Sequence, residues 1–254
     1  YLMKKKILGL IPSRLSSTRL HQKPLLKINN VPIIIHTYMR AKLSKKLDDL
    51  YICCDHKLIY DLAKKYGAKV IYTSKKNKNG TERIAEGLKK IKKKYDLIID
   101  IQGDEPLISP DHIDKVINEH LKNFNYDIIL PSVKSKNIDT PNIVKVVINK
   151  KKEIMYLSRA SIPYEFKKKK KYSLKHLSII SFKPKALLKF KSEKQTLIEK
   201  IEGIELMRAL EIGLRMKTIF LKGRSFSVDV KKDFIKAKKF MKKDSVFRLY
   251  KKFI

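Results

Sequence analysis

The feature that most constrains this chain is an apolar run, residues 97–101, that ends abruptly in polar residues. The surrounding segment, residues 96–106, is Asp-Leu-Ile-Ile-Asp-Ile-Gln-Gly-Asp-Glu-Pro. An aliphatic run of this kind is typical of a buried central strand, and open α/β sheets bind ligands just beyond the carboxyl ends of such strands. Because the chain is otherwise strongly basic, the carboxylates of Asp104 and Glu105 at this place indicate a site for a hard cation rather than a salt bridge.

Apolar runs alternate with amphipathic stretches along the first 105 residues. Strands are expected at 7–11, 50–54, 70–72 and 97–101, and helices at 33–43, 58–66 and 80–91. This alternation predicts a parallel sheet with helices on its faces. Later helices are expected at 110–122, 198–213 and 231–254, and later strands at 128–133, 144–148, 153–157, 178–182, 217–221 and 226–230. Residues 164–175 are expected to form a basic loop, and because no linker composition divides the chain we expect a single domain over residues 1–254.

The composition limits where the protein can reside. Hydrophobic residues make up 43% of the chain, but no apolar run approaches the roughly 20 residues of a membrane-spanning helix. The first dozen residues are basic and then apolar, yet the apolar part is shorter than that of a secretory signal, so we expect a buried strand and a cytoplasmic protein. Cys53 and Cys54 are adjacent in an expected strand and point to opposite faces, which disfavours a disulfide or a shared metal.

The formal net charge of +35 raises the alternative of a nucleic-acid-binding module. Most of the 60 basic residues are lysines scattered along the chain, and their runs at 92–94, 150–152 and 167–171 lie between periodic segments. Interleaved aromatic residues are sparse, and there is no tryptophan. We therefore expect no nucleic-acid partner, although a basic field should raise encounter rates with anionic substrates.

The first expected strand leads into a loop, residues 12–25, that is rich in hydroxyl groups and carries the cations Arg14, Arg19 and Lys23. Several donors and positive charges converging from one loop suit a triphosphate. The sequence contains neither a Walker-type phosphate loop nor a glycine-rich dinucleotide fingerprint there. From these residues alone, phosphate binding and an ordinary polar loop both remain open.

Several segments together resemble one family, the 3-deoxy-D-manno-octulosonate (KDO) cytidylyltransferases, also called CMP-KDO synthetases. The matching segments, in family order and at similar spacing, are Ile11–Leu20 with Lys23–Leu25, Asp55-His56, Asn79–Glu86, Gln102–Pro106, Pro141–Val147, Ser158–Pro163 and Val228-Asp229. The resemblance implies a nucleotidyltransferase-type, Rossmann-like three-layer α/β sandwich with a mainly parallel central sheet. It also implies a small inserted sheet, at about residues 135–190, that binds substrate and forms a homodimer.

The resemblance further implies a reaction and the residues that carry it. CTP and KDO would give CMP-KDO and pyrophosphate for lipopolysaccharide synthesis, with Mg²⁺ as cofactor and the anomeric hydroxyl of the sugar as the attacking group. The catalytic residues would be Arg14, Lys23 and Asp104, and the metal ligands Asp104 and Asp229. The nucleotide would be bound by Pro12, Ser13, Arg14, Lys23, Arg83 and Gln102, and the sugar by Gln102, Arg159, His176 and Glu205.

Most of these residues also have an ordinary structural interpretation when each is taken alone. Asp104 is placed to cap a helix, Arg83 is suited to a helix surface, and a packed structural histidine is the default for His176. Arg19 is as well placed to brace its loop as to bind phosphate, and Asp100 is interpreted as structural.

Two departures from the family pattern fall on the expected sugar pocket. Leu206 follows Glu205 where the family usually has glutamine, and residues 178–180 are Ser-Ile-Ile where it usually has Gly-Ile-Tyr. Because a polar pocket discriminates strongly between hydroxyl patterns, the sugar could instead be a modified KDO such as 8-amino-KDO, or another acidic sugar. A sialic-acid-type enzyme is disfavoured because its Gly-Gly-Ser-Lys loop is absent. The spore-coat polysaccharide family is disfavoured because it has Gly-Asp-Cys-Pro at the acidic turn, and the intact loop and carboxylates disfavour an inactive relative.

Overall fold

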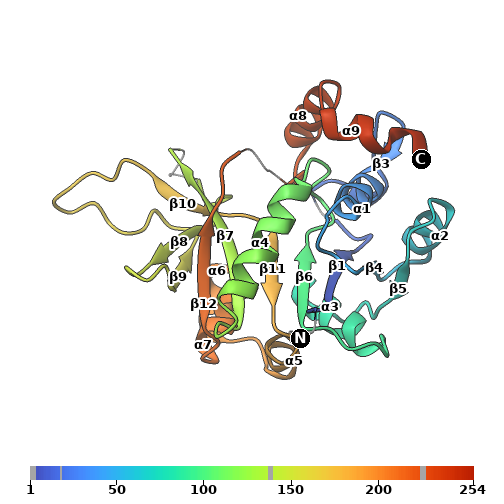
Figure 1. Ribbon diagram of the computed structural model, residues 1–254. Coiled ribbons are helices and arrows are strands. Elements are labelled where there is room, and N and C mark those ends of the chain that lie inside the picture. The colour runs from blue at the N-terminus through green and yellow to red at the C-terminus, as the bar shows by residue number, and fades with distance from the viewer. Residues whose placement is uncertain (1–3, 18, 137–139, 224–226) are drawn as a thin grey trace. The chain divides into compact units, whose positions relative to one another are not determined.

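The computed structural model describes residues 4–17, 19–136, 140–223 and 227–254 (Figure 1). The chain divides into two compact units, the first comprising Tyr1–Lys115 with Ser225–Ile254 and the second Val116–Arg224. The boundary falls inside helix α4, Pro110–Lys122. The insertion expected at about residues 135–190 lies within the second unit, and its predicted bounds and role stay predictions.

The first unit is built on a parallel sheet. Its strands are β1 (Ile7–Ser13), β4 (Asp49–Cys54), β5 (Val70–Tyr72) and β6 (Leu97–Ile101), in the order β5-β4-β1-β6. Every residue of β1 and β6 is buried, as their continuous aliphatic runs predict for central strands covered on both faces. The parallel pairing of β1 with β4 and β6, and of β4 with β5, confirms the sheet expected from the alternation.

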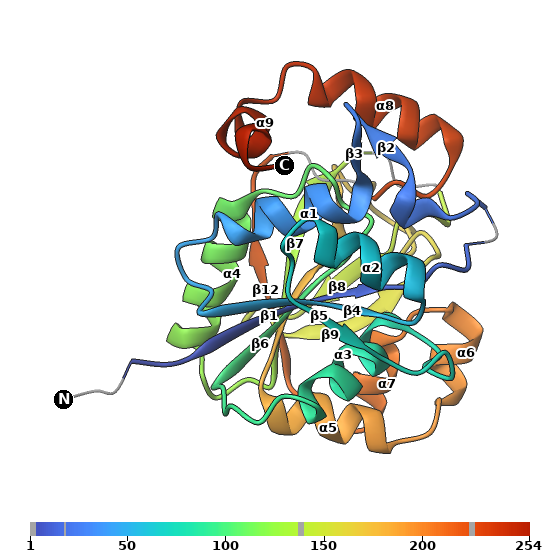
Figure 2. The ribbon, with the colours of Figure 1, turned by 90° about the vertical axis from the view of Figure 1, so that its right-hand side faces the viewer.

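Helices cover both faces of this sheet. Figure 2 shows α1 (Ile33–Lys42) and α2 (Lys57–Lys65) on one face and α3 (Gly80–Lys89) on the other. Gly67, with a φ of 67°, follows the end of α2 in the left-handed conformation expected of a helix C-cap. Cys53 and Cys54, the last two residues of β4, are both buried.

The C-terminal segment returns to the first unit. Helices α8 (Lys231–Met241) and α9 (Ser245–Tyr250), followed by η2 (Lys251–Phe253), lie beside α1 and the short strands β2 (Lys27–Ile28) and β3 (Val31–Pro32) in Figures 1 and 2. Their contacts include a buried cluster made by Ile28, Ile33, Val228, Ala237 and Met241. The expected helical tail is confirmed, but residues 227–230 form no strand, and residue 226 lies outside the described residues.

The second unit contains a mixed sheet around β7 (Ile128–Ser135). β10 (Ser173–His176) and β11 (Ile179–Phe182) pair with β7 in antiparallel fashion, and β12 (Met216–Phe220) pairs with it in parallel. β8 (Lys145–Ile148) and β9 (Ile154–Ser158) form the expected antiparallel pair, and β8 also contacts β10. Strand β10 occupies the end of the segment that was expected to be a loop.

The helices of the second unit differ from expectation in two respects. They are α5 (Pro184–Ser192), α6 (Leu197–Glu202) and α7 (Leu206–Glu211). The single helix predicted at 198–213 was wrong, because Gly203 adopts a φ of 61° and ends α6. Helix α5 was not predicted. No helix in the described part of the chain has the length and apolar content that crossing a bilayer requires.

Candidate active site

Two carboxylates and one ammonium group meet at the carboxyl end of β6. The Nζ of Lys23 donates to Oδ2 of Asp104 at 2.6 Å and to Oδ1 of Asp229 at 3.1 Å. Asp104 follows β6, Lys23 lies in the loop after β1, and Asp229 precedes α8. The fold therefore brings together three of the predicted site residues from segments more than 200 residues apart. All three side chains are partly shielded, with exposed fractions of 15% for Lys23, 26% for Asp104 and 33% for Asp229.

Backbone contacts place the two carboxylates beside each other. The amide of Val228 donates to the carbonyl of Asp104 at 2.9 Å, which joins the C-terminal segment to the turn after β6. Asp229 Oδ2 also accepts from the hydroxyl of Ser227 at 2.8 Å. The carboxylate of Asp233 caps α8 by accepting from the amides of Asp229 and Val230. Both candidate metal ligands therefore belong to one hydrogen-bonded arrangement.

The turn that carries Asp104 requires glycine at position 103. A Cβ atom added to Gly103 would lie 2.7 Å from the carbonyl oxygen of Pro12 and 2.9 Å from Cδ1 of Ile34. The turn therefore approaches the end of β1 more closely than any side chain would allow. On the other side, Thr37 of α1 donates its hydroxyl to the carbonyl of Gly103 at 3.2 Å.

Lys23 is oriented by a short 3-10 helix, η1 (Lys23–Leu25), with Pro24 in its first turn. Burial favours the neutral amine, but the charge and hydrogen bond of Asp104, followed by those of Asp229, outweigh it and raise the pKa of Lys23. Burial likewise raises the pKa of Asp229, but the charge of Lys23 and the Ser227 hydroxyl outweigh it and lower that pKa. Lys23 and Asp229 are thus both charged at neutral pH.

The carboxylates of Asp104 and Asp229 fit a magnesium ion. Mg²⁺ takes oxygen ligands, commonly one or two carboxylates, and completes its shell with water and substrate phosphates. Because both carboxylates accept from the same Lys23 nitrogen, they lie close enough to share a ligand. Among the described residues there is no group of three or more acidic, histidine or cysteine side chains suited to a metal, so an all-protein cage is not present there.

Beside this cluster, the ends of β1 and β6 form a second polar region. The Nε2 of Gln102 donates to both carboxylate oxygens of the buried Asp100, at 3.0 and 2.9 Å. This leaves Oε1 of Gln102 as an acceptor. A Cβ atom added to Gly80, at the start of α3, would lie 3.2 Å from Gln102 Nε2 and 3.3 Å from the ring of Pro12. The predicted residues Pro12 and Gln102 are therefore neighbours, and Asp100 has a role in orienting the amide of Gln102.

Ser13, the last residue of β1, and Arg14, which follows it, lie in contrasting environments. The hydroxyl of Ser13 is buried and has no hydrogen-bond partner in the described structure, which is unusual for a buried polar atom and typical of a site that receives a ligand. Arg14 is exposed. Arg19, which is 61% exposed, reaches Asp229 Oδ1 at 3.3 Å, so its observed contact is with a carboxylate of the cluster.

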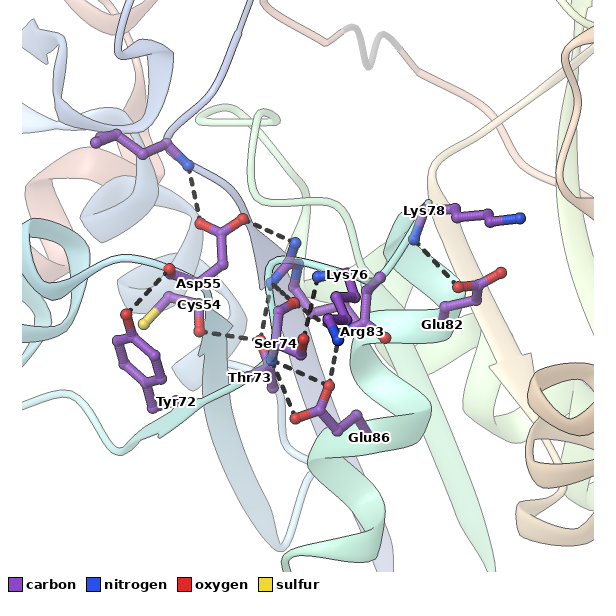
Figure 3. Close-up of polar contacts among 12 residues, drawn as sticks. Cys54, Asp55, Tyr72, Thr73, Ser74, Lys76, Lys78, Glu82, Arg83 and Glu86 are labelled. Atoms are coloured by element: carbon purple, nitrogen blue, oxygen red, sulfur yellow. Dashed lines mark hydrogen bonds and ion pairs between the residues drawn. The ribbon is translucent and has the colours of Figure 1, made fainter.

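Arg83 is the predicted residue whose surroundings differ most from expectation. It is 3% exposed, and its Nη2 donates to Asp55 Oδ2 at 2.9 Å (Figure 3). Its Nη1 donates to Oγ1 of Thr73 at 2.8 Å and to the carbonyl of Ser74 at 3.3 Å. These bonds hold Arg83 inside the first unit, and its contact with the nucleotide stays a prediction.

In the second unit, Arg159 braces the turn between α6 and α7. Its Nε donates to the carbonyl of Glu202 at 3.0 Å, and its Nη2 donates to that of Gly203 at 3.2 Å. Its Nη1 donates to the carbonyl of Pro141 at 2.8 Å. A guanidinium has five N–H groups, so these three bonds leave two for a ligand. The predicted contact with the sugar stays a prediction.

His176 and Glu205 lie at the ends of two elements of the same unit. His176 ends β10, and its buried Nδ1 has no hydrogen-bond partner among the described residues. Burial, followed by the charge of Lys175, lowers the pKa of His176 to about 4, so the ring is neutral at pH 7. A neutral imidazole ring has one nitrogen that donates a hydrogen bond and one that accepts. Glu205 is half-buried at the N-terminus of α7, whereas Leu206 is 1% exposed.

A buried ion pair that was not predicted joins α6 to α7. Arg208 donates from Nε and Nη2 to the two carboxylate oxygens of Glu199, at 2.8 and 2.7 Å, and its guanidinium lies 4.2 Å from the centre of the Phe190 ring. Glu199 and Arg208 are nine residues apart, whereas residues that face each other on one helix are three or four apart. The sequence therefore carried no signal for the pair. The contact of Asp55 with Arg83 was also not predicted.

Three comparisons with known proteins agree. The sequence model described as cytidylyltransferase matches residues 8–219. The 3-deoxy-manno-octulosonate cytidylyltransferase of Thermodesulfovibrio yellowstonii is 37% identical over 244 residues, covering 90% of this chain and 95% of that protein. The mitochondrial enzyme of the same name from Arabidopsis thaliana is 36% identical and covers 93% of this chain and 83% of its own.

Among solved structures, a CMP:2-keto-3-deoxy-manno-octonic acid synthetase complexed with CTP matches with a TM-score of 0.89 and 27% identity, covering 94% of this chain and 99% of that one. A putative glucose-1-phosphate thymidylyltransferase from Bacillus anthracis matches with a TM-score of 0.69 at 16% identity, covering 94% of this chain and 96% of that one. The second likeness concerns the fold alone. Together with the first, it confirms the expected nucleotidyltransferase-type α/β fold.

Proposed function

Because this chain belongs to the 3-deoxy-manno-octulosonate cytidylyltransferase family, we propose that it transfers CMP from CTP to the anomeric hydroxyl of KDO, giving CMP-KDO and pyrophosphate. The protein is a nucleotidyltransferase. The observation that carries the proposal is the convergence of Lys23, Asp104 and Asp229 at the carboxyl end of β6. Transfer of a nucleotidyl group requires mainly positioning and neutralisation of phosphate charge, and this cluster supplies both cation and metal-binding carboxylates.

Six of the predicted site residues in the first unit have a role in this proposal. Lys23 and the exposed Arg14 bind the triphosphate, while the unpartnered hydroxyl of Ser13 and the free Oε1 of Gln102 are available to the nucleotide or the sugar. Asp104 and Asp229 hold Mg²⁺. When bound, that ion polarises the α-phosphate, lowers the pKa of a hydroxyl near it and shields the charge of pyrophosphate.

The sugar-binding residues of the second unit remain part of the proposal. The neutral ring of His176 and the two remaining N–H groups of Arg159 suit a hydroxylated carboxylic acid. The alternative of a modified sugar was based partly on Leu206. That side chain is 1% exposed, and the relatives that match nearly the whole chain are named 3-deoxy-manno-octulosonate cytidylyltransferases. KDO is therefore the sugar we propose.

We also propose that the enzyme is a homodimer and that it acts in the cytoplasm, supplying lipopolysaccharide synthesis. The support for a dimer is a set of apolar side chains exposed on the second unit, including Met155 at 61%, Tyr164 at 85% and Phe166 at 82%. Exposed apolar groups of this size commonly mark a protein interface. Light scattering of the wild-type protein and of Tyr164→Lys/Phe166→Lys tests the dimer, and subcellular fractionation tests the location.

The reaction is tested by measuring pyrophosphate release from CTP and Mg²⁺, with KDO, 8-amino-KDO and a sialic acid offered separately. We expect release with KDO, and a product whose mass is that of CMP-KDO. Release only with 8-amino-KDO would retain the reaction class and refute the sugar. No release with any of the three would refute the proposed reaction.

A further inference from the structure

Asp55 lies between two parts of the first unit, the loop after β1 and helix α3, and forms hydrogen bonds with both. It lies directly after β4 and is 5% exposed. Its Oδ1 accepts from the backbone amide of Leu15 at 3.1 Å, and its Oδ2 accepts from Arg83 at 2.9 Å (Figure 3). One buried carboxylate thus joins the loop after β1 to helix α3.

The Arg83 side of this connection is held firmly. Thr73, which receives a hydrogen bond from Arg83, donates its own hydroxyl to the carbonyl of Cys54 at 2.9 Å. The backbone amide of Thr73 donates to the same carbonyl at 2.7 Å. Arg83, Thr73 and the end of β4 therefore form a closed network in which the guanidinium of Arg83 has little freedom to move.

The Leu15 side is the start of the nucleotide loop, which we define as residues 14–23. Leu15 follows Arg14 and lies two residues after Ser13, the last residue of β1. The hydrogen bond to Asp55 therefore fixes the backbone just after it leaves the sheet, directly after Arg14, which is proposed to contact CTP. A carboxylate accepting a backbone N–H makes a charge-assisted bond, which is stronger than a neutral one.

We propose that Asp55 is a positioning residue for the nucleotide loop, and that Arg83 acts on the nucleotide through Asp55 by holding this carboxylate in line with the amide of Leu15. This inference rests on the proposed function, because it assumes that residues 14–23 bind CTP. It explains why the arginine at the start of α3 is buried among protein groups. In this arrangement, losing the connection loosens the loop before CTP binds, so the apparent affinity for CTP falls while the groups that react are unchanged.

The test must separate positioning from simple stability. Removing Asp55 or Arg83 alone would leave an unpaired charge in the core, and such a variant can fail to fold. The double variant Asp55→Ala/Arg83→Met removes both charges and retains apolar volume, so it is expected to fold. Glu86→Ala is the matched control. Glu86 lies on the same helix as Arg83 and accepts from the amide of Ser74 and from the side chain of Asn77, and among the described residues it makes no bond to the nucleotide loop.

Two measurements are made on the full-length proteins: steady-state kinetics with CTP and KDO, and amide hydrogen exchange across residues 12–25 without substrate. We expect the double variant to raise the KM for CTP about tenfold, equivalent to about 1.4 kcal/mol, with the KM for KDO changed less than about twofold. We also expect exchange at Leu15 to accelerate about tenfold or more. Glu86→Ala should leave the KM for CTP and the exchange at Leu15 at wild-type values.

Equal effects of the double variant and Glu86→Ala on the KM for CTP would overturn the proposal, as would unchanged exchange at Leu15 in the double variant. If the wild-type protein itself fails to turn over CTP, the proposed function fails and the kinetic comparison is replaced by exchange alone. In that case, faster exchange at Leu15 in the double variant still supports Asp55 as the anchor of the loop, and unchanged exchange still refutes it.

Discussion

Gly103 offers a way to displace the carboxylate of Asp104, which we propose to be catalytic, without changing any group that reacts. In Gly103→Ala, the new Cβ would begin 2.7 Å from the carbonyl oxygen of Pro12, and ordinary contact starts near 3.4 Å. The turn must therefore shift by about 0.7 Å, the difference between these distances, because the obstructing atom belongs to the backbone of a buried central strand. Overpacking of this kind costs about 1–3 kcal/mol of folding free energy.

Two assays follow from that displacement. For a protein of this size, about 1–3 kcal/mol corresponds to a fall in Tm of roughly 2–10 °C, measured by differential scanning fluorimetry. Misplacement by about 1 Å can cost about 100-fold in rate, so a shift of about 0.7 Å at the neighbouring Asp104 should lower kcat by roughly 10- to 100-fold. Activity is measured as pyrophosphate release at saturating CTP, well below the Tm of the variant.

Gly67→Ala is the control for this experiment. Gly67 has a φ of 67° and no atom within 4 Å of an added Cβ, so alanine there is strained by about 1–2 kcal/mol without touching the site. We expect a fall in Tm similar to that of Gly103→Ala and a wild-type kcat. A Gly103→Ala enzyme that kept the kcat of wild type would refute the reasoning that this close approach positions Asp104.

Three further predictions concern charge and burial. Lys23→Met should lower kcat/KM for CTP by about 100-fold or more, because it removes the cation that we propose binds the triphosphate. An equal loss of kcat/KM for CTP in a distant surface variant, Lys115→Met, would contradict this prediction. Burial lowers the pKa values of His36 and His120 to about 4, so the unfolded chain binds more protons between about pH 6.5 and pH 4 and stability should fall as the pH falls through that window. Urea midpoints measured across this range check that prediction, and a constant midpoint would contradict it. Leu206→Gln should lower the free energy of unfolding by about 1–3 kcal/mol, because it buries an amide. We expect the ratio of activities toward KDO and 8-amino-KDO to stay unchanged in this variant. A shift of that ratio toward KDO would place Leu206 at the sugar.

The sheet of the first unit was predictable because β1 and β6 are continuous aliphatic runs and because strands alternate with amphipathic helices along this part of the chain. The run ending at Ile101 and the acidic turn after it define both a central strand and the place where Asp104 lies. The helix break at Gly203 was also encoded, because glycine favours a left-handed conformation, but helical periodicity on both sides concealed it. Strand β10 was concealed by the lysines around it, which are compatible with a strand whose residues are only half-buried.

The candidate site was predictable in its residues and much less so in their contacts. Asp229 lies 125 positions after Asp104, and no local pattern indicates that one lysine contacts both. Arg83 illustrates the same limit, since its partner Asp55 is 28 residues away and a sequence cannot show whether a guanidinium faces a ligand or a carboxylate. The burial of Leu206 depends on how α6 and α7 pack, which is decided by long-range contacts.

We propose that the carboxylates of Asp104 and Asp229 form the metal-dependent catalytic centre. The most direct test is Asp104→Asn, which preserves the shape of the side chain and removes its charge, with turnover of CTP and KDO measured across a range of Mg²⁺ concentrations. We predict a wild-type circular dichroism spectrum and no Mg²⁺-dependent pyrophosphate release. An Asp104→Asn enzyme that turned over with the kcat and Mg²⁺ dependence of wild type would contradict the claim.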